Sequence, residues 1–117
     1  MTTYTRAEVA TELLRDTGLV GEDETPSSAA QEGAEKVVEA GIGTLRSLGV
    51  ILLDSDENNV QHELLYPIID YCAPIVQRQN GEIDRATSVQ LMRAAEQQIR
   101  RITSFGPSYA VLETEHY

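Results

Sequence analysis

Apolar positions recur at helical spacing in four stretches of the chain. In the first stretch, Thr5 and Glu8 have the spacing of a capping box, and Tyr4 is placed to pack on Val9 as a hydrophobic staple. Gly18 stands where a left-handed residue commonly follows the end of a helix. The apolar face between these signals consists of Val9, Ala10, Leu13 and Leu14. We therefore predict a helix between Thr5 and Gly18.

The second stretch predicts a longer helix that ends at Gly49. Thr25 is a favourable N-cap, and Pro26 suits the first helical position. The apolar stripe that follows consists of Ala30, Ala34, Val37, Val38, Ile42, Leu45 and Leu48. Gly41 and Gly43 lie inside this stripe, and each costs about 1 kcal/mol relative to alanine in a helix interior. We expect another helix to cross closely at these glycines.

The chain between Gly49 and residue 80 has a less regular pattern. The run Val50-Ile51-Leu52-Leu53 is apolar throughout and predicts a buried extended segment or a small strand. A third helical stretch begins near Asp56, and its apolar seam consists of Val60, Leu64, Ile68, Cys72 and Ile75. Pro67 and Pro74 each remove a backbone hydrogen bond, so we expect a kink, or a break near Tyr66. We interpret Tyr66 as a packing residue.

The fourth stretch begins at Asp84, a favourable N-cap. Its apolar arc at 3.6 residues per turn consists of Ser88, Leu91, Met92, Ala95, Ile99 and Ile102. Four arginines lie off this arc: Arg85, Arg93, Arg100 and Arg101. The four stretches predict a mainly α fold, a small four-helix bundle-like domain with a short β element. We place this domain at residues 1–103.

Residues 104–117 differ in character from the helical domain. Gly106-Pro107 breaks the helical pattern, and no Lys or Arg follows. The apolar and aromatic residues here are Phe105, Tyr109, Val111, Leu112 and Tyr117. A segment of this kind can add to the edge of a sheet in another protein, and many copies docking together strengthen such a contact. The alternative is a disordered terminus, although disordered tails usually avoid such residues. We predict an extended C-terminal arm.

Charge and composition narrow the function classes. The 117 residues suggest one domain with one modest core. The net charge of −10 argues against a protein that clamps nucleic acid through a basic face. It is compatible with a protein that DNA passes without binding, because a like-charged wall repels phosphates. No apolar run approaches the roughly 18 residues of a membrane span, and the N-terminus does not resemble a signal peptide. We expect a protein made in the cytoplasm.

Candidate catalytic and metal-ligating residues are few. Residues 54–58 begin like a calcium loop, but Asn59 and Leu65 occupy the positions of its glycine and its bidentate glutamate. A helix-capping turn suits this segment better. We interpret His62 as a surface histidine and Cys72 as a small core residue. We expect neither an enzyme nor a bound metal or cofactor.

The four arginines of the last helical stretch admit three interpretations. A solvated helix face is the simplest, and contact with DNA is weakened by the negative net charge. The third interpretation pairs the arginines with Glu22, Asp23 and Glu24 of a neighbouring copy. Subunits of a ring present different faces to their two neighbours, and complementary charges suit a contact of this kind.

Several local motifs resemble a known family. They are Thr5-Arg6-Ala7-Glu8 with Leu13-Leu14, then Gly18-Leu19-Val20-Gly21-Glu22, and Glu24-Thr25-Pro26-Ser27 before a long alanine-rich helix. The later stretch Leu65-Tyr66-Pro67-Ile68-Ile69 with Ala73-Pro74 is also similar. Over roughly residues 4–80 the chain resembles the head-to-tail adaptor proteins (connector or head-completion proteins) of tailed bacteriophages. Related proteins often carry a tryptophan near the end of the second helix, and this chain has none.

The resemblance implies a structural protein of the virion neck, between capsid and tail. It implies a ring, usually a dodecamer, that docks under the portal protein, extends the DNA channel and presents a platform for the next tail component. By the same resemblance, residues 104–117 are a portal-docking arm, with Phe105, Tyr109, Val111, Leu112 and Tyr117 as anchors. DNA would pass through an acidic lumen without specific binding, and assembly would take place in the host cytoplasm.

Two other classes of protein stay open at this point. A free-standing acidic regulatory or DNA-mimicking interaction module explains the charge but not the apolar C-terminal segment. A small metal-dependent hydrolase that uses His62 with nearby acids explains neither.

Overall fold

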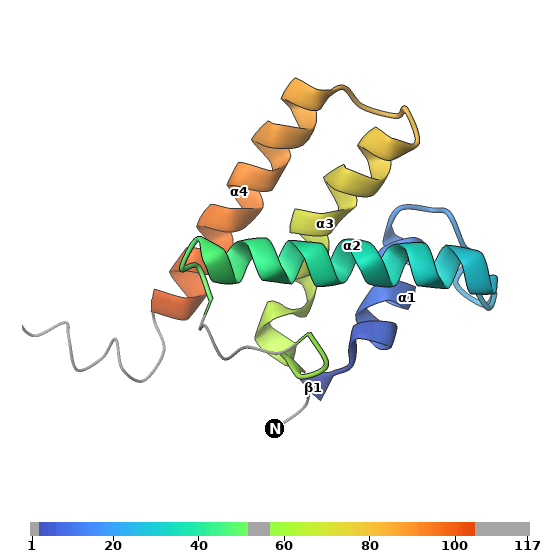
Figure 1. Ribbon diagram of the computed structural model, residues 1–117, viewed down its shortest axis with the longest axis horizontal. Helices are drawn as coiled ribbons and strands as arrows, with labels where there is room; N and C mark the ends of the chain where they lie inside the picture. The colour runs from blue at the N-terminus through green and yellow to red at the C-terminus, as the bar shows by residue number, and fades with distance from the viewer. Residues whose placement is uncertain (1–2, 52–56, 105–117) are drawn as a thin grey trace, which may run out of the picture.

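The computed structural model describes residues 3–51 and 57–104, which form a mainly helical fold (Figure 1). Its α-helices are α1 (Arg6–Asp16), α2 (Ser28–Ser47), α3 (Leu65–Gln79) and α4 (Arg85–Ser104). Strands β1 (Thr3–Tyr4) and β2 (Val60–Gln61) pair antiparallel, and a 3₁₀ turn, η1 (His62–Leu64), leads from β2 into α3. The predicted class, mainly α with a short β element, is confirmed. No helix in these two ranges is long and apolar enough to cross a bilayer.

Helix α3 is the centre of the arrangement. It packs against the other three helices, whereas α1 packs on α2 and α3, and α4 packs mainly on α3. Figure 1 shows α1 and α4 on opposite sides of α3, with α2 crossing over it. Because α3 is covered from three directions, most of its residues are buried, namely Leu65, Pro67, Ile68, Ile69, Tyr71, Cys72, Ala73, Pro74 and Val76.

Both ends of α1 follow the predicted motifs. The amide of Glu8 donates to Thr5 Oγ1 at 3.2 Å, and the amide of Thr5 donates to Glu8 Oε1 at 2.8 Å. These two hydrogen bonds complete the capping box. Gly18 has φ +78°, and the amide of Leu19 donates to the Leu14 carbonyl oxygen at 3.0 Å. The left-handed glycine therefore ends α1, as its position predicted.

The start of α2 differs from the prediction. The N-cap is Ser27 and not Thr25, because Ser27 Oγ accepts the amide of Ala30 at 3.1 Å and the helix begins at Ser28. Ser27 has extended backbone angles, as an N-cap requires. Thr25 and Pro26 consequently lie outside the helix. Both Thr25 and Ser27 satisfy the local capping rules, and the later of the two forms the cap.

The third predicted helix begins later than expected, at Leu65. Val60 belongs to β2, and η1 follows it, so the chain between residues 57 and 64 is not α-helical. Pro67 lies in the first turn of α3, where its missing N–H needs no helical partner. Pro74 lies inside the helix. The delayed start corresponds to the break that the prolines predicted.

The short β element forms at a different place from the predicted one. The pairing joins β1 to β2, two segments far apart in the sequence. Val50 and Ile51 are buried but belong to no strand, and Leu52 and Leu53 lie outside the described residues. A strand needs a hydrogen-bonding neighbour, and the N-terminal segment supplies one to β2.

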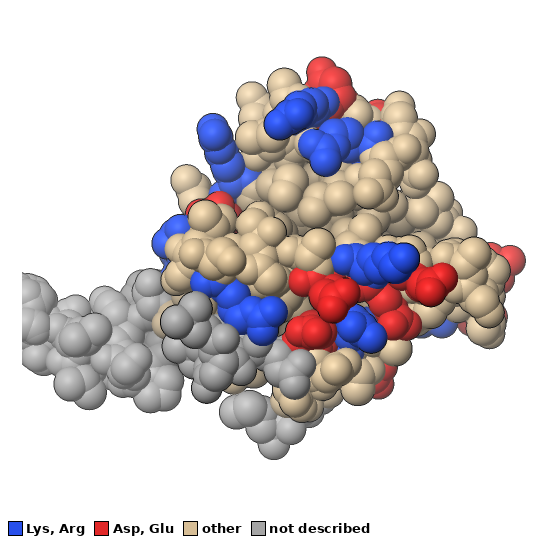
Figure 2. Space-filling view, viewed as in Figure 1, with Lys and Arg blue, Asp and Glu red and all other residues tan. Residues whose placement is uncertain are grey.

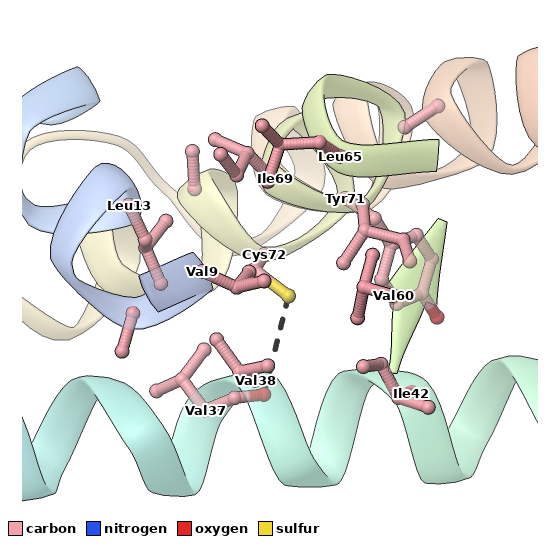
Figure 3. Packing of buried hydrophobic residues seen from close by; sticks show 14 of the residues in the cluster. Val9, Leu13, Val37, Val38, Ile42, Val60, Leu65, Ile69, Tyr71 and Cys72 are labelled. Carbon is pink, nitrogen blue, oxygen red and sulfur yellow. Dashed lines mark hydrogen bonds between the residues drawn. The ribbon is translucent and has the colours of Figure 1, made fainter. Parts of the chain in front are cut away.

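The close helix crossing predicted at the glycines of α2 occurs at Gly41. A Cβ on Gly41 would lie 2.8 Å from Cys72 Sγ of α3, closer than packed atoms approach. Figure 3 shows the sulfur of Cys72 directed at α2, where the thiol donates to the Val37 carbonyl oxygen over 4.0 Å. Gly43 is different, because only the end of the Arg46 side chain comes within 4.0 Å of such a Cβ. The crossing therefore explains Gly41 alone.

Helix α4 begins as predicted, with Asp84 Oδ1 accepting the amide of Thr87 at 2.7 Å. Its predicted apolar arc is only partly buried, and the buried members are Ser88, Ala95 and Ile99. The prediction of Leu91 as a core residue is wrong, since 44% of its surface is exposed. Because α4 packs mainly on one neighbouring helix, the covered strip is narrow and Leu91 lies at its edge.

We expect Gly41→Ala to lower the free energy of unfolding by roughly 1–3 kcal/mol, because the added methyl group meets the Cys72 sulfur in a packed core. Gly33 is a matched control in the same helix, because a Cβ added there would have no neighbouring atom within 4 Å. Gly33→Ala should instead raise stability by about 0.5–1 kcal/mol. Urea unfolding followed by circular dichroism measures both changes, and a stabilising Gly41→Ala would contradict the close crossing.

Candidate subunit interface

Three of the four arginines of α4 share one face of the helix. At 3.6 residues per turn, Arg85, Arg93 and Arg100 fall within an arc of about 80°, and Arg101 extends this arc to about 160°. All four side chains are exposed. We call Arg85, Arg93 and Arg100 the arginine face.

One member of the arginine face already has an acidic neighbour. Arg100 Nη2 and Nε lie 2.9 and 3.1 Å from the same oxygen, Glu96 Oε2, one turn earlier in α4. Exposed pairs at this spacing contribute only about 0.3–0.5 kcal/mol, so Arg100 can exchange partners readily. Within residues 3–51 and 57–104, neither Arg85 nor Arg93 forms an ion pair. These two guanidinium groups are available to a partner.

The predicted acidic partners Glu22, Asp23 and Glu24 lie in the loop between α1 and α2, and all three are exposed. Glu24 Oε1 accepts the amide of Gly21 at 2.7 Å, so this carboxylate also closes a turn. Figure 1 shows the loop at the end of α2 that is remote from α4. The structure does not bring the loop and the arginine face together in one chain, which leaves both surfaces available to neighbours.

Charge is separated between two sides of the molecule. Residues 6–24, which span α1 and the loop after it, contain six acidic and two basic residues, a net charge of −4. Residues 85–104, which form α4, contain four arginines and one glutamate, a net charge of +3. In Figure 2, basic side chains lie over the α3–α4 hairpin, and acidic and basic side chains lie side by side around α2. Because α3 lies between α1 and α4, the two charged sides face apart.

Several carboxylates of α2 and of the segment before β2 are paired with Arg6 of α1. Arg6 Nε lies 3.4 Å from a carboxylate oxygen of Glu35, and Arg6 Nη1 lies 3.7 Å from Glu39 and 4.0 Å from Glu57. The amide of Arg6 also donates to Asn58 Oδ1 at 3.3 Å. These contacts connect the start of α1 to α2 and to the segment before β2. Their role is to hold these segments together.

The sequence pattern did not single out a second acidic surface, along the seam between α1 and α3. Glu8, Glu12 and Asp16 recur every four residues on one side of α1. Desolvation, followed by the charge of Asp16, raises the pKa of Asp70 in α3 above the ordinary aspartate value. The two helices thus bring carboxylates close together. The four-residue spacing was the available signal, since such residues share one side of a helix.

A groove of about 420 Å³ lies at this seam, lined by Tyr4, Glu8, Thr11, Glu12, Arg15, Leu65 and Tyr66. The predicted packing role of Tyr66 is wrong, because 57% of its surface is exposed. Tyr66 follows Leu64 by two residues and precedes Ile68 by two, which places it on the side of α3 opposite the predicted seam. Its side chain therefore contributes to the wall of the groove and not to the core.

Cys72 and His62, the two residues considered as candidates for catalysis or metal binding, both have contacts that are typical of structural residues. Cys72 is buried in the core as predicted, and burial raises the pKa of its thiol to about 12. His62 is exposed as predicted, with Nδ1 3.0 Å from Tyr4 Oη and the two rings stacked. Residues 54–56 of the calcium-loop-like segment lie outside the described residues. In the described part of the chain, no three His, Cys, Asp or Glu side chains are arranged to hold a metal ion.

The five predicted anchors of the C-terminal arm, Phe105, Tyr109, Val111, Leu112 and Tyr117, lie outside the described residues. Their role stays a prediction. Comparison with known proteins gives no match: no family model, no curated protein and no solved structure matches this chain.

We expect the free energy of unfolding to fall between about pH 9 and pH 12 through Cys72. The pKa of this thiol is raised from 9.0 to about 12 in the fold, so in this window the folded chain keeps a proton that the unfolded chain has lost. Stability then decreases by up to about 1.4 kcal/mol per pH unit. Urea unfolding at pH 8.5 and 10.5 measures the effect, and Cys72→Ala should lack this component. An identical pH dependence in both proteins would contradict the buried thiol.

Proposed function

We propose that this chain is a ring-forming head-to-tail adaptor of a tailed bacteriophage. The observation that supports the proposal most is the opposite placement of charge, −4 over residues 6–24 and +3 over α4, on the two sides of α3. Complementary faces on opposite sides of a subunit join copies head to tail, which is the contact that a ring uses. The resemblance of residues 4–80 to head-to-tail adaptor proteins indicates which kind of ring these copies form.

In this proposal, about twelve copies dock under the portal protein in the virion neck. Residues 104–117 are the docking arm, and the arginine face of one copy meets the acidic side of the next. At a charge of −10 per chain, the ring encloses an acidic channel that DNA passes without specific binding. The ring presents a platform for the next tail or neck component. No cofactor, metal or membrane takes part.

The arm should be necessary for binding to the portal. We expect full-length chain mixed with the portal ring of the same virus to form a complex of many copies, and a chain that stops at Thr103 to form none. The physical reason is that the apolar anchors and the extended backbone of the arm supply the contact. Native mass spectrometry counts the bound copies directly.

A full-length variant with Tyr109, Val111 and Leu112 replaced by serine distinguishes the contribution of the apolar anchors to portal binding from that of the length of the arm. It should bind as poorly as the truncated chain. Equal binding by all three chains would move the portal interface onto the helical domain. Absence of binding by every chain, with the portal ring intact, would overturn the adaptor and favour the acidic regulatory module.

Arg93→Glu should weaken the association between copies roughly tenfold, because it places like charges opposite one another at the contact. Arg78→Glu makes the same charge change in the last turn of α3, outside the arginine face, and is the matched control, expected to stay close to wild type. The readout is the number of copies per portal ring at equal protein concentration. Equal losses in the two variants would show that the arginine face is not the contact.

A further inference from the structure

The groove between α1 and the start of α3 has walls that are held in place before any partner arrives. Glu8 Oε1 is fixed by the capping box, and the ring of Tyr4 stacks on His62 with its hydroxyl 3.0 Å from Nδ1. Leu65 is buried and forms part of the floor. A preformed groove loses little conformational entropy when it is occupied. We call it the acidic groove.

The chemistry of the acidic groove suits a guanidinium group. Tyr66 offers an exposed aromatic ring, and Glu8 and Glu12 offer carboxylates beside it. Arginine stacks on aromatic faces and forms two-pronged hydrogen bonds with carboxylates, which a lysine ammonium does less well. Tyrosine and arginine are also the residues that most often dominate the binding energy of protein interfaces.

The charge of the acidic groove points to a cationic occupant. Arg15 Nη1 lies 3.3 Å from Glu12 and offsets one of the two carboxylates, so the lining keeps a net negative charge. Asp16 and Asp70 extend the negative surface along the same seam, where desolvation, followed by repulsion from Asp16, raises the pKa of Asp70. A cation placed there relieves this repulsion.

We propose that Arg93 of a second copy of this chain enters the acidic groove, with its guanidinium group against Tyr66 and the carboxylates of Glu8 and Glu12. Arg93 lies between Arg85 and Arg100 along the axis of α4, is exposed, and has no ion pair within residues 3–51 and 57–104. This inference rests on the proposed ring and names the contact that joins its subunits. It also makes the seam between α1 and α3, and not only the loop at residues 22–24, the acceptor surface.

The positions of the two surfaces fit a contact that propagates from copy to copy. The acidic groove is lined by residues of β1, α1 and α3, whereas the arginine face belongs to α4 on the other side of α3. Each copy can therefore accept one neighbour and donate to another at the same time. Such heterologous contacts generate rings when the rotation between copies closes.

Chemical cross-linking tests the contact between Arg93 and the acidic groove while the side chains that form it are all kept. Gln97 lies one turn after Arg93 and Asp70 one turn after Tyr66, and both are exposed. A Gln97→Cys chain and an isotope-labelled Asp70→Cys chain are mixed with a short bismaleimide. The native Cys72 is buried, with its thiol pKa raised to about 12, so it does not compete. The mixed product is identified by mass.

The mixed pair should cross-link at least about tenfold faster than a pair in which Gln98→Cys replaces Gln97→Cys. Gln98 is an exposed glutamine next along α4, about 100° around the helix. Adding Arg93→Gln to one partner, or Tyr66→Leu to the other, should remove most of this advantage, whereas Arg78→Gln in α3 should not. Equal rates for the Gln97 and Gln98 pairs, or no effect of Arg93→Gln and Tyr66→Leu, would overturn the proposal.

The same mixtures, measured with and without the portal ring, test the adaptor function and the contact between copies independently. Binding to the portal without preferential cross-linking would retain the adaptor and overturn the contact between Arg93 and the acidic groove. Preferential cross-linking without portal binding would retain the contact and overturn the adaptor. Selective capture of an unrelated arginine-rich peptide by the acidic groove, with no cross-linking between copies, would assign the groove to another partner and overturn the self-contact.

Discussion

The close crossing of α2 over α3 is the contact on which the rest of the arrangement depends. Gly41 has no side chain, and the Cys72 sulfur lies only 2.8 Å from where a larger residue would place its Cβ. Buried residues of α2 such as Val38 and Ile42 can then join one continuous core with those of α3 (Figure 3). Helix α1 packs against both helices, and α4 has the other side of α3 on which to pack. The opposite positions of α1 and α4 follow from this packing.

This arrangement decides which surfaces are open to partners. Helix α3 is so extensively covered that, before its last turn, only Tyr66 and Asp70 are exposed, and both lie at the seam with α1. The same covering keeps the charge of α4 apart from that of α1 and the loop after it. Exposed charges contribute little to folding stability, so their separation costs the fold little and acts mainly on association. A chain with two complementary and opposite sides can join to copies of itself.

The local features of the fold were predictable from the sequence because they depend on neighbouring residues. The capping box at Thr5, the cap at Asp84 and the left-handed glycines 18 and 49 are set by hydrogen bonds and backbone angles within a few positions. The arginines of α4 could be assigned to its surface for the same reason, since helical periodicity separates them from the apolar arc. The start of α2 was misplaced because residues 25 and 27 both satisfy the local capping rules.

By itself, then, the sequence determined the four helices, the ends that local hydrogen bonds specify, the buried role of Cys72 and the net charge. Only the tertiary structure decided that β1 pairs with β2, that Leu91 and Tyr66 are exposed, and that opposite charges lie on opposite sides of α3. The acidic groove likewise requires α1 and α3 to be placed side by side. The physical reason is that burial and charge proximity arise from contacts between residues distant in sequence, and periodicity along one helix does not specify which of its sides a second helix will cover.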